Sequence, residues 1–188
     1  SNCTFTANTA GSKFNYPRGG GLRVDHYGTI TDCEFTENRC VLEFANGQSS
    51  IGGGGVFGNY DLTISNTSFT GNLVEFTGDP NASSDSYAVG GGAISCRSRL
   101  AIENECVFDG NRVVLSNVPT QRSGGGAILC RDDSSDYLNI SQSSFSNNEV
   151  ILEGDRAYSA VGGGAIHRYF GNSLSLQMTD CTLTGNRF

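Results

Sequence analysis

The chain has 188 residues, a formal net charge of −7 at pH 7 and a pI near 4.7. An acidic chain with only 12 Lys and Arg residues is poorly suited to neutralising a run of phosphates, which argues against nucleic-acid binding. No apolar run approaches the ~20 residues of a membrane-spanning helix. Glycine is about twice as frequent as usual, with 26 residues, whereas proline numbers 3, so the composition excludes collagen and Pro-rich linkers.

Two short signatures alternate along the chain. The first, Gly-Gly-Ala-Ile, occurs at residues 91–94, 125–128 and 163–166, with looser copies at 20–22 and 54–57. The second is an apolar residue three positions before an asparagine, as in Phe5/Asn8, Phe35/Asn38, Phe69/Asn72, Phe108/Asn111, Phe145/Asn148 and Leu183/Asn186. Taking Leu22, Phe57, Ile94, Ile128 and Ile166 as equivalent gives a period of about 36 residues, which indicates a repeat architecture. The predicted units are 1–17 (partial), 18–52, 53–89, 90–123, 124–161 and 162–188.

Within each unit, apolar residues alternate with the period of β-strands. One predicted strand comprises residues 62–64, 100–102, 138–140 and 174–176, and another follows each asparagine, at 40–42, 74–76, 113–115 and 150–152. Hairpins would need a turn dipeptide such as Asn-Gly at each reversal, and only Asn46-Gly47 fits. With the glycine-led strand, the expected fold is therefore all-β: a parallel β-helix, or solenoid, of about five rungs with three short strands each.

Stacked rungs place equivalent side chains above one another, about 4.8 Å apart. The phenylalanines are expected to form an inward column and the asparagines a second column at a corner, since asparagine tolerates left-handed turns and its amide both donates and accepts. Glycines are expected at corners that a Cβ atom would obstruct. The variable excursions, such as residues 77–87, are the natural place for recognition.

Seven cysteines lie at positions 3, 33, 40, 96, 106, 130 and 181. Cys96 and Cys130 occupy the same position on successive rungs, and so do Cys3 and Cys33. Because neighbouring rungs bring Cα atoms within disulfide range, Cys96–Cys130 and Cys3–Cys33 are predicted disulfides. The alternative is that reduced thiols fill an interior column as small apolar side chains.

Four sequons mark Asn2, Asn66, Asn81 and Asn139 as candidate glycan carriers. The offset of Asn2 and Asn66 from the aromatic column points both outward. The alternative is that a chain rich in Asn, Ser and Thr produces sequons by chance.

Catalytic and metal-binding candidates are few. Asp132, Asp133 and Asp136, beside Arg131 and one rung above Arg97, form a weak Ca²⁺ or acid–base candidate, and a solvated turn is the favoured interpretation. His26 and His167 are too far apart along the array to share a metal, and the parity of His167 places it on the surface. No cofactor is predicted. The tyrosines that fall in or near turns are candidates for a sugar- or protein-binding surface: Tyr60, Tyr87, Tyr137, Tyr158 and Tyr169.

The pairing of Gly-Gly-Ala-Ile with Phe-x-x-Asn resembles the repeats of the chlamydial polymorphic outer membrane proteins. This resemblance implies a right-handed parallel β-helix of the pectin-lyase-like kind, displayed on a cell surface as an adhesin passenger. We therefore expect a non-enzymatic structural or adhesive segment of a large extracellular or cell-surface solenoid, such as a filament or stalk shaft. The alternative is a carbohydrate-active β-helix, namely a polysaccharide lyase or hydrolase or a glycan-binding module.

The expected partners follow from this reading. Natural solenoids cap their end strands, and no polar cap is visible, so we expect a window on a longer chain or units that join end to end. The variable loops are expected to contact glycans or cell-surface proteins. We expect no nucleic-acid partner and no membrane insertion by this segment.

Overall fold

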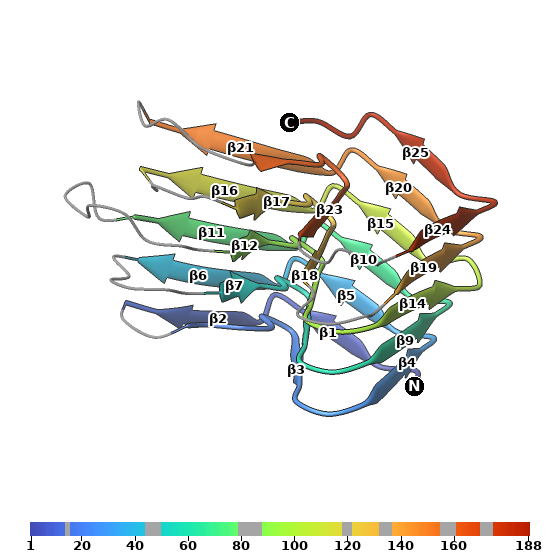
Figure 1. The fold of residues 1–188 in the computed structure, drawn as a ribbon. Helices are drawn as coiled ribbons and strands as arrows, with labels where there is room; N and C mark the ends of the chain where they lie inside the picture. The colour runs from blue at the N-terminus through green and yellow to red at the C-terminus, as the bar shows by residue number, and fades with distance from the viewer. Residues whose placement is uncertain are drawn as a thin grey trace.

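A computed structural model of the chain describes residues 1–13, 16–43, 50–78, 88–117, 122–131, 137–154, 161–169 and 175–188. The regular elements in these ranges are β-strands, arranged in five sheets in which every pair of neighbours is parallel (Figure 1). None of these ranges contains a helix long and apolar enough to cross a membrane.

The sheets are named A to E in the order in which the chain visits them. Sheet A contains β1 (Thr4–Thr6), β5 (Glu34–Thr36), β10 (Ser68–Thr70), β15 (Val107–Asp109), β20 (Ser144–Ser146) and β25 (Thr182–Thr184). Sheet B contains β2 (Thr9–Ser12), β6 (Arg39–Glu43), β11 (Leu73–Thr77), β16 (Arg112–Ser116) and β21 (Glu149–Glu153). Sheet C contains β7 (Ser50–Gly52), β12 (Ala88–Gly90), β17 (Arg122–Gly124) and β22 (Val161–Gly162). Sheet D contains β3 (Leu22–Val24), β8 (Val56–Gly58), β13 (Ile94–Cys96), β18 (Ile128–Arg131) and β23 (Ile166–Tyr169). Sheet E contains β4 (Gly28–Thr31), β9 (Leu62–Ser65), β14 (Leu100–Glu103), β19 (Leu138–Ser141) and β24 (Leu176–Thr179).

Neighbours within a sheet come from successive turns of the chain, so the fold is a parallel β-solenoid, as the repeat predicts. A complete turn carries five strands, however, and not three. The Phe-x-x-Asn segment forms a strand of its own in sheet A, because a residue with positive φ separates it from the strand in sheet B. The strands of sheet C are short and glycine-rich, and they therefore carry little of the alternating apolar signal by which strands are recognised.

Two register assignments from the sequence are wrong. Leu22 pairs with Val56, not with Phe57, which lies one position later on the opposite face of sheet D. Likewise, the strand expected at residues 174–176 lies two residues later, because Leu138 pairs with Leu176. In both places a second apolar residue satisfies the same local pattern, and only the stacking between turns distinguishes the two choices.

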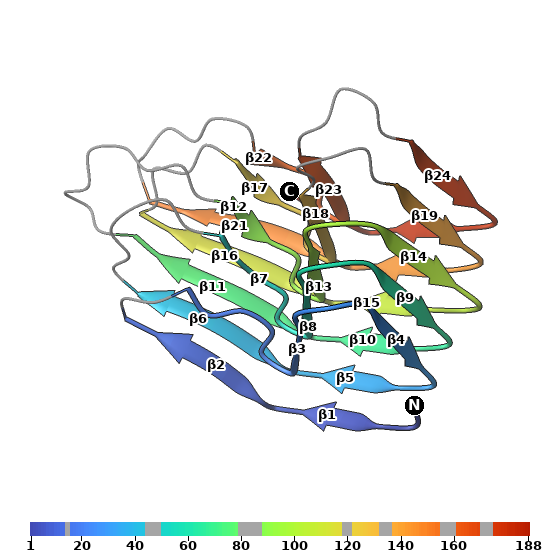
Figure 2. The same cartoon turned by 60° about the horizontal axis from the view of Figure 1, so that its bottom comes forward.

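The interior is divided into two apolar clusters. Side chains from sheets A, D and E, such as Phe69, Ile94 and Ile102, form the larger cluster, whereas sheets B and C enclose a thinner one that includes Leu42 and Val89. Figure 2 shows the corresponding shape, in which sheets B and C form a narrow arm beside the wider part bounded by A, D and E. The outer side of sheet D consequently faces the inner corner between the arm and the wider part.

Candidate functional site

The asparagines of the repeat form a continuous hydrogen-bonded ladder between sheets A and B. The backbone N–H and the Nδ2 group of Asn111 donate to Oδ1 of Asn148 at 3.0 and 2.9 Å, and Nδ2 also donates to the carbonyl oxygen of Phe69 at 2.9 Å. Asn72 donates to Oδ1 of Asn111 in the same way. The pattern connects Asn8, Asn38, Asn72, Asn111, Asn148 and Asn186.

A column of stacked rings lies beside this ladder. Consecutive rings of Phe5, Phe35, Phe69, Phe108 and Phe145 have centroids 4.5 to 5.0 Å apart and planes within 6° of parallel. Leu183 continues the column by pairing with Phe145, and it is 50% exposed at the C-terminal end of the solenoid. The spacing of the rings equals the spacing of parallel strands, so the column follows directly from in-register stacking.

Left-handed residues shape the corners, although not the residues that the sequence suggested. The ladder asparagines do not have positive φ; the residue immediately before each of them does, as at Ala7, Gly71 and Asn147. Between sheets C and D, the left-handed residue of each turn is glycine: Gly19, Gly53, Gly91, Gly125 and Gly163. A Cβ atom on Gly125 would lie 1.9 Å from the carbonyl oxygen of Ile128, so this corner requires glycine. The corner before each ladder asparagine does not, since Ala7 and Asn147 occupy it.

All seven cysteines are free thiols, and neither predicted disulfide is present. Cys96 and Cys130 are register partners in sheet D, yet their Sγ atoms lie near backbone carbonyl oxygens, including that of Ser98. The Sγ atoms of Cys3 and Cys33 likewise lie near the carbonyl oxygens of neighbouring residues. In-register parallel strands hold Cβ atoms about 4.8 Å apart, which exceeds the ~3.8 Å that a disulfide needs. The Cα separation used in the sequence prediction is therefore not a sufficient criterion.

The candidate glycan carriers differ in their surroundings. Asn2 and Asn66 are exposed at the corner between sheets E and A, and the amide of Asn66 donates to Oδ1 of Asp32 at 2.6 Å. Asn139 lies within β19 and is half-buried, with an Oδ1 atom that is buried and has no hydrogen-bond partner in the described part of the chain. Asn81 lies outside the described residues. Accessibility therefore favours Asn2 and Asn66 as sites of modification.

The weak metal candidate, Asp132, Asp133 and Asp136, lies outside the described residues. Within the described ranges, no group of three or more His, Cys, Asp and Glu side chains could hold a metal ion.

The two histidines lie in different surroundings. His26 stacks on the ring of Tyr60, with centroids 5.8 Å apart. His167 is half-buried rather than on the surface, because it packs against the glycines of sheet C, and burial lowers its pKa.

Arginines gather at the inner corner beside sheet D. The guanidinium of Arg18 lies over the ring of Phe57, 4.9 Å from its centroid. Burial lowers the pKa of Arg18, and the nearby charges of Arg97 and Arg23 lower it further. Arg23 forms an ion pair with Asp25 at 2.9 Å, so the cluster contains both signs of charge.

Residues 66–97 match the Chlamydia polymorphic membrane protein (Chlamydia_PMP) repeat. The matched segment contains Phe69 and Asn72 of the two columns and ends just after the Gly-Gly-Ala-Ile step at 91–94. No curated protein and no solved structure matches the chain. The resemblance drawn from the two signatures is thereby confirmed in this part of the solenoid.

Proposed function

We propose that this chain is a non-enzymatic segment of a surface-displayed β-solenoid, serving as a stiff shaft that presents variable turns to adhesive contacts. The observation that carries this proposal is the unbroken asparagine ladder, which runs through every turn with its central members fully buried. The name of the matched repeat, which refers to membrane proteins of Chlamydia, supports a location at a cell surface and a role as a passenger segment.

The end faces of the solenoid support stacking of further turns. At the C-terminal end, the apolar side chains of Leu176 and Leu183 are 45% and 50% exposed. Each earlier ladder asparagine donates its backbone N–H to Oδ1 of the asparagine on the next turn. At the C-terminal end, the backbone N–H of Asn186 occupies the equivalent donor position. At the other end, Oδ1 of Asn8 occupies the matching acceptor position. The donors of one face match the acceptors of the other, which supports the proposal that further repeats or another copy of the same chain stack on them.

The experiment compares assembly of the wild-type chain with that of two variants, by light scattering and electron microscopy over a range of concentrations. Leu183→Lys places a charge on the end face, whereas Val107→Lys places one on the side of sheet A, where the valine is 40% exposed. We expect rods that lengthen with concentration for the wild type and for Val107→Lys, and only short particles for Leu183→Lys. Discrete particles near 19.9 kDa for all three would contradict the end-to-end stacking of copies.

A further inference from the structure

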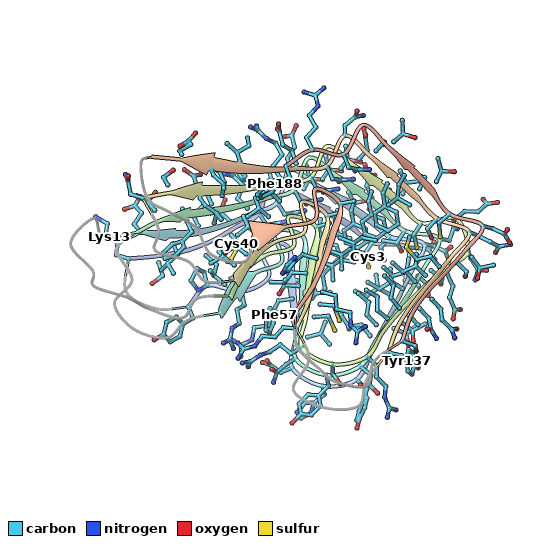
Figure 3. The ribbon with its side chains drawn as sticks, turned by 45° about the horizontal axis from the view of Figure 1, so that its top comes forward. Cys3, Lys13, Cys40, Phe57, Tyr137 and Phe188 are labelled. Atoms are coloured by element: carbon cyan, nitrogen blue, oxygen red, sulfur yellow. The ribbon has the colours of Figure 1, made fainter. Side chains whose placement is uncertain are left out.

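A strip of side chains crosses four successive turns of the solenoid where the chain passes from sheet D to sheet E. It consists of His26, Tyr27, Tyr60, Asp61, Ser98, Arg99 and Tyr137. The three tyrosines are 76%, 45% and 39% exposed in chain order, which makes them the most exposed aromatic side chains on this edge in the described ranges. Figure 3 shows Tyr137 at the outer edge of the molecule, near sheet E.

The members of the strip touch from each turn to the next. In the first two turns, His26 and Tyr27 contact the ring of Tyr60, with centroids 5.8 and 5.9 Å apart. In the next step, Asp61 accepts a 2.8 Å hydrogen bond from Ser98 Oγ and lies 3.9 Å from the Nη1 atom of Arg99.

The guanidinium of Arg99 then lies over the ring of Tyr137, 5.6 Å from its centroid. The rings are thus held in place by neighbouring turns and do not depend on a ligand to order them.

This arrangement has the chemistry of a carbohydrate site. Tyr60 and Tyr137 belong to turns two apart, so their rings mark two platforms separated by about 10 Å along the solenoid. Between them, Asp61 offers carboxylate oxygens that accept hydrogen bonds from hydroxyls, while Arg99 and Ser98 offer donors. One face of each ring is covered from the preceding turn, by His26 at Tyr60 and by Arg99 at Tyr137, so a sugar ring, with its apolar face and hydroxyl-lined edge, would contact the opposite face.

The charges and the width of the strip favour this class of ligand over others. Arg99 lies beside Asp61, so the strip has little net charge and offers no excess of cations to an acidic polymer. The strip is a single row of turn residues, which is narrow for a protein interface of about 800 Å² per partner. We propose that this strip of described residues binds a neutral oligosaccharide lying along the solenoid axis; this inference deepens the adhesive part of the proposed function and rests on it.

Binding is measured by calorimetry with maltotetraose, chitotetraose, mannotetraose and cellotetraose as probes. Tyrosine fluorescence provides a second readout, since the chain has no Trp. Tyr60→Ala and Tyr137→Ala remove the two platforms, and Tyr16→Ala is the matched control, because Tyr16 is 43% exposed and lies outside the strip. All variants are checked for an unchanged far-UV spectrum and melting temperature before binding is measured.

We expect at least one probe to bind, with affinity reduced about fivefold or more by each strip variant and unchanged by the control, as for truncation of an aromatic contact residue. The proposal is overturned if none of the four probes binds, if the strip variants bind as well as Tyr16→Ala, or if only heparin binds. Each of these results leaves the assembly experiment on the end faces unaffected, so failure of the sugar site is distinguishable from failure of the shaft role.

Discussion

Replacement of Asn111 by alanine tests whether the asparagine ladder stabilises the solenoid. The side chain is fully buried and takes part in four hydrogen bonds: two from Nδ2, to Phe69 O and Asn148 Oδ1, and two that Oδ1 accepts from the backbone N–H and Nδ2 of Asn72. Alanine retains none of them. The substitution therefore leaves buried donors without partners on the preceding turn.

The magnitude follows from the groups left unsatisfied. These are the backbone N–H of Asn72 and one N–H of its side-chain amide, since Asn148 Oδ1 still accepts from the backbone of residue 111. At about 1 kcal/mol or more for each buried group, Asn111→Ala should lower the free energy of unfolding by ~2 kcal/mol.

Urea denaturation followed by far-UV circular dichroism measures this change. Asn8→Ala is the matched control, because Asn8 occupies the same column but is exposed. Its side chain contributes one hydrogen bond to the ladder, from Nδ2 to Oδ1 of Asn38. The control should cost well under ~1 kcal/mol. If the two variants unfold at the same urea concentration, the buried hydrogen bonds of the ladder do not stabilise the fold.

Three further predictions concern other positions in the turns. Ser123→Val should raise the free energy of unfolding by ~1 kcal/mol in the same assay, because Ser123 Oγ is fully buried with no partner among the described residues and Val89 occupies the equivalent position one turn earlier. Gly110→Ala should lower the free energy of unfolding by only the ~1–2 kcal/mol of a left-handed alanine, because a Cβ atom there would meet nothing within 4 Å. Gly125→Ala should lower it clearly more, because its Cβ atom would clash with the carbonyl oxygen of Ile128. Equal melting temperatures for the two variants would contradict this steric difference. Iodoacetamide at pH 8 should label exposed Cys3 but not Cys40, because burial raises the pKa of Cys40 to about 12. The same raised pKa makes the free energy of unfolding depend on pH. The contribution of the neutral Cys40 thiol is complete below the ordinary pKa of 9.0 and is lost as the pH rises toward 12. Mass spectrometry that finds Cys40 alkylated in the folded chain would refute this assignment.

The parts of the fold that recur in every turn were predictable from the sequence. The spacing of Phe69 and Asn72, repeated along the chain, was sufficient to predict both stacked columns and hence a parallel solenoid. The strands of sheet C escaped prediction because glycines occupy their outward positions, as at Gly90, and side chains of sheet D pack against them. The choice of Phe57 as the equivalent of Leu22 failed for a related reason. The inner corner buries the outward-facing ring of Phe57, so an apolar pattern alone does not distinguish it from the inward-facing Val56.

The strip between sheets D and E was beyond sequence reasoning for a different reason. Its tyrosines do not recur at one register position: Tyr27 is followed by Asp61, then Arg99, then Tyr137. These turns therefore show no repeat in the sequence, even though single tyrosines in them were candidates for a sugar- or protein-binding surface. Only the stacking of turns shows that the ring of Tyr60 and the guanidinium of Arg99 belong to one continuous surface.

This difference follows from where the backbone demands particular residues. The corner before each ladder asparagine, the glycine corner between sheets C and D, and the corner between sheets E and A each contain residues with positive φ, as at Gly71, Gly91 and Asn66. In the turns between sheets D and E, by contrast, residues 25–27, 59–61 and 97–99 have none. Because neither left-handed geometry nor the buried columns constrain these positions, they can vary in chemistry without weakening the solenoid. A shaft of this kind can therefore change what it binds along this edge while the three corners that contain left-handed residues stay fixed.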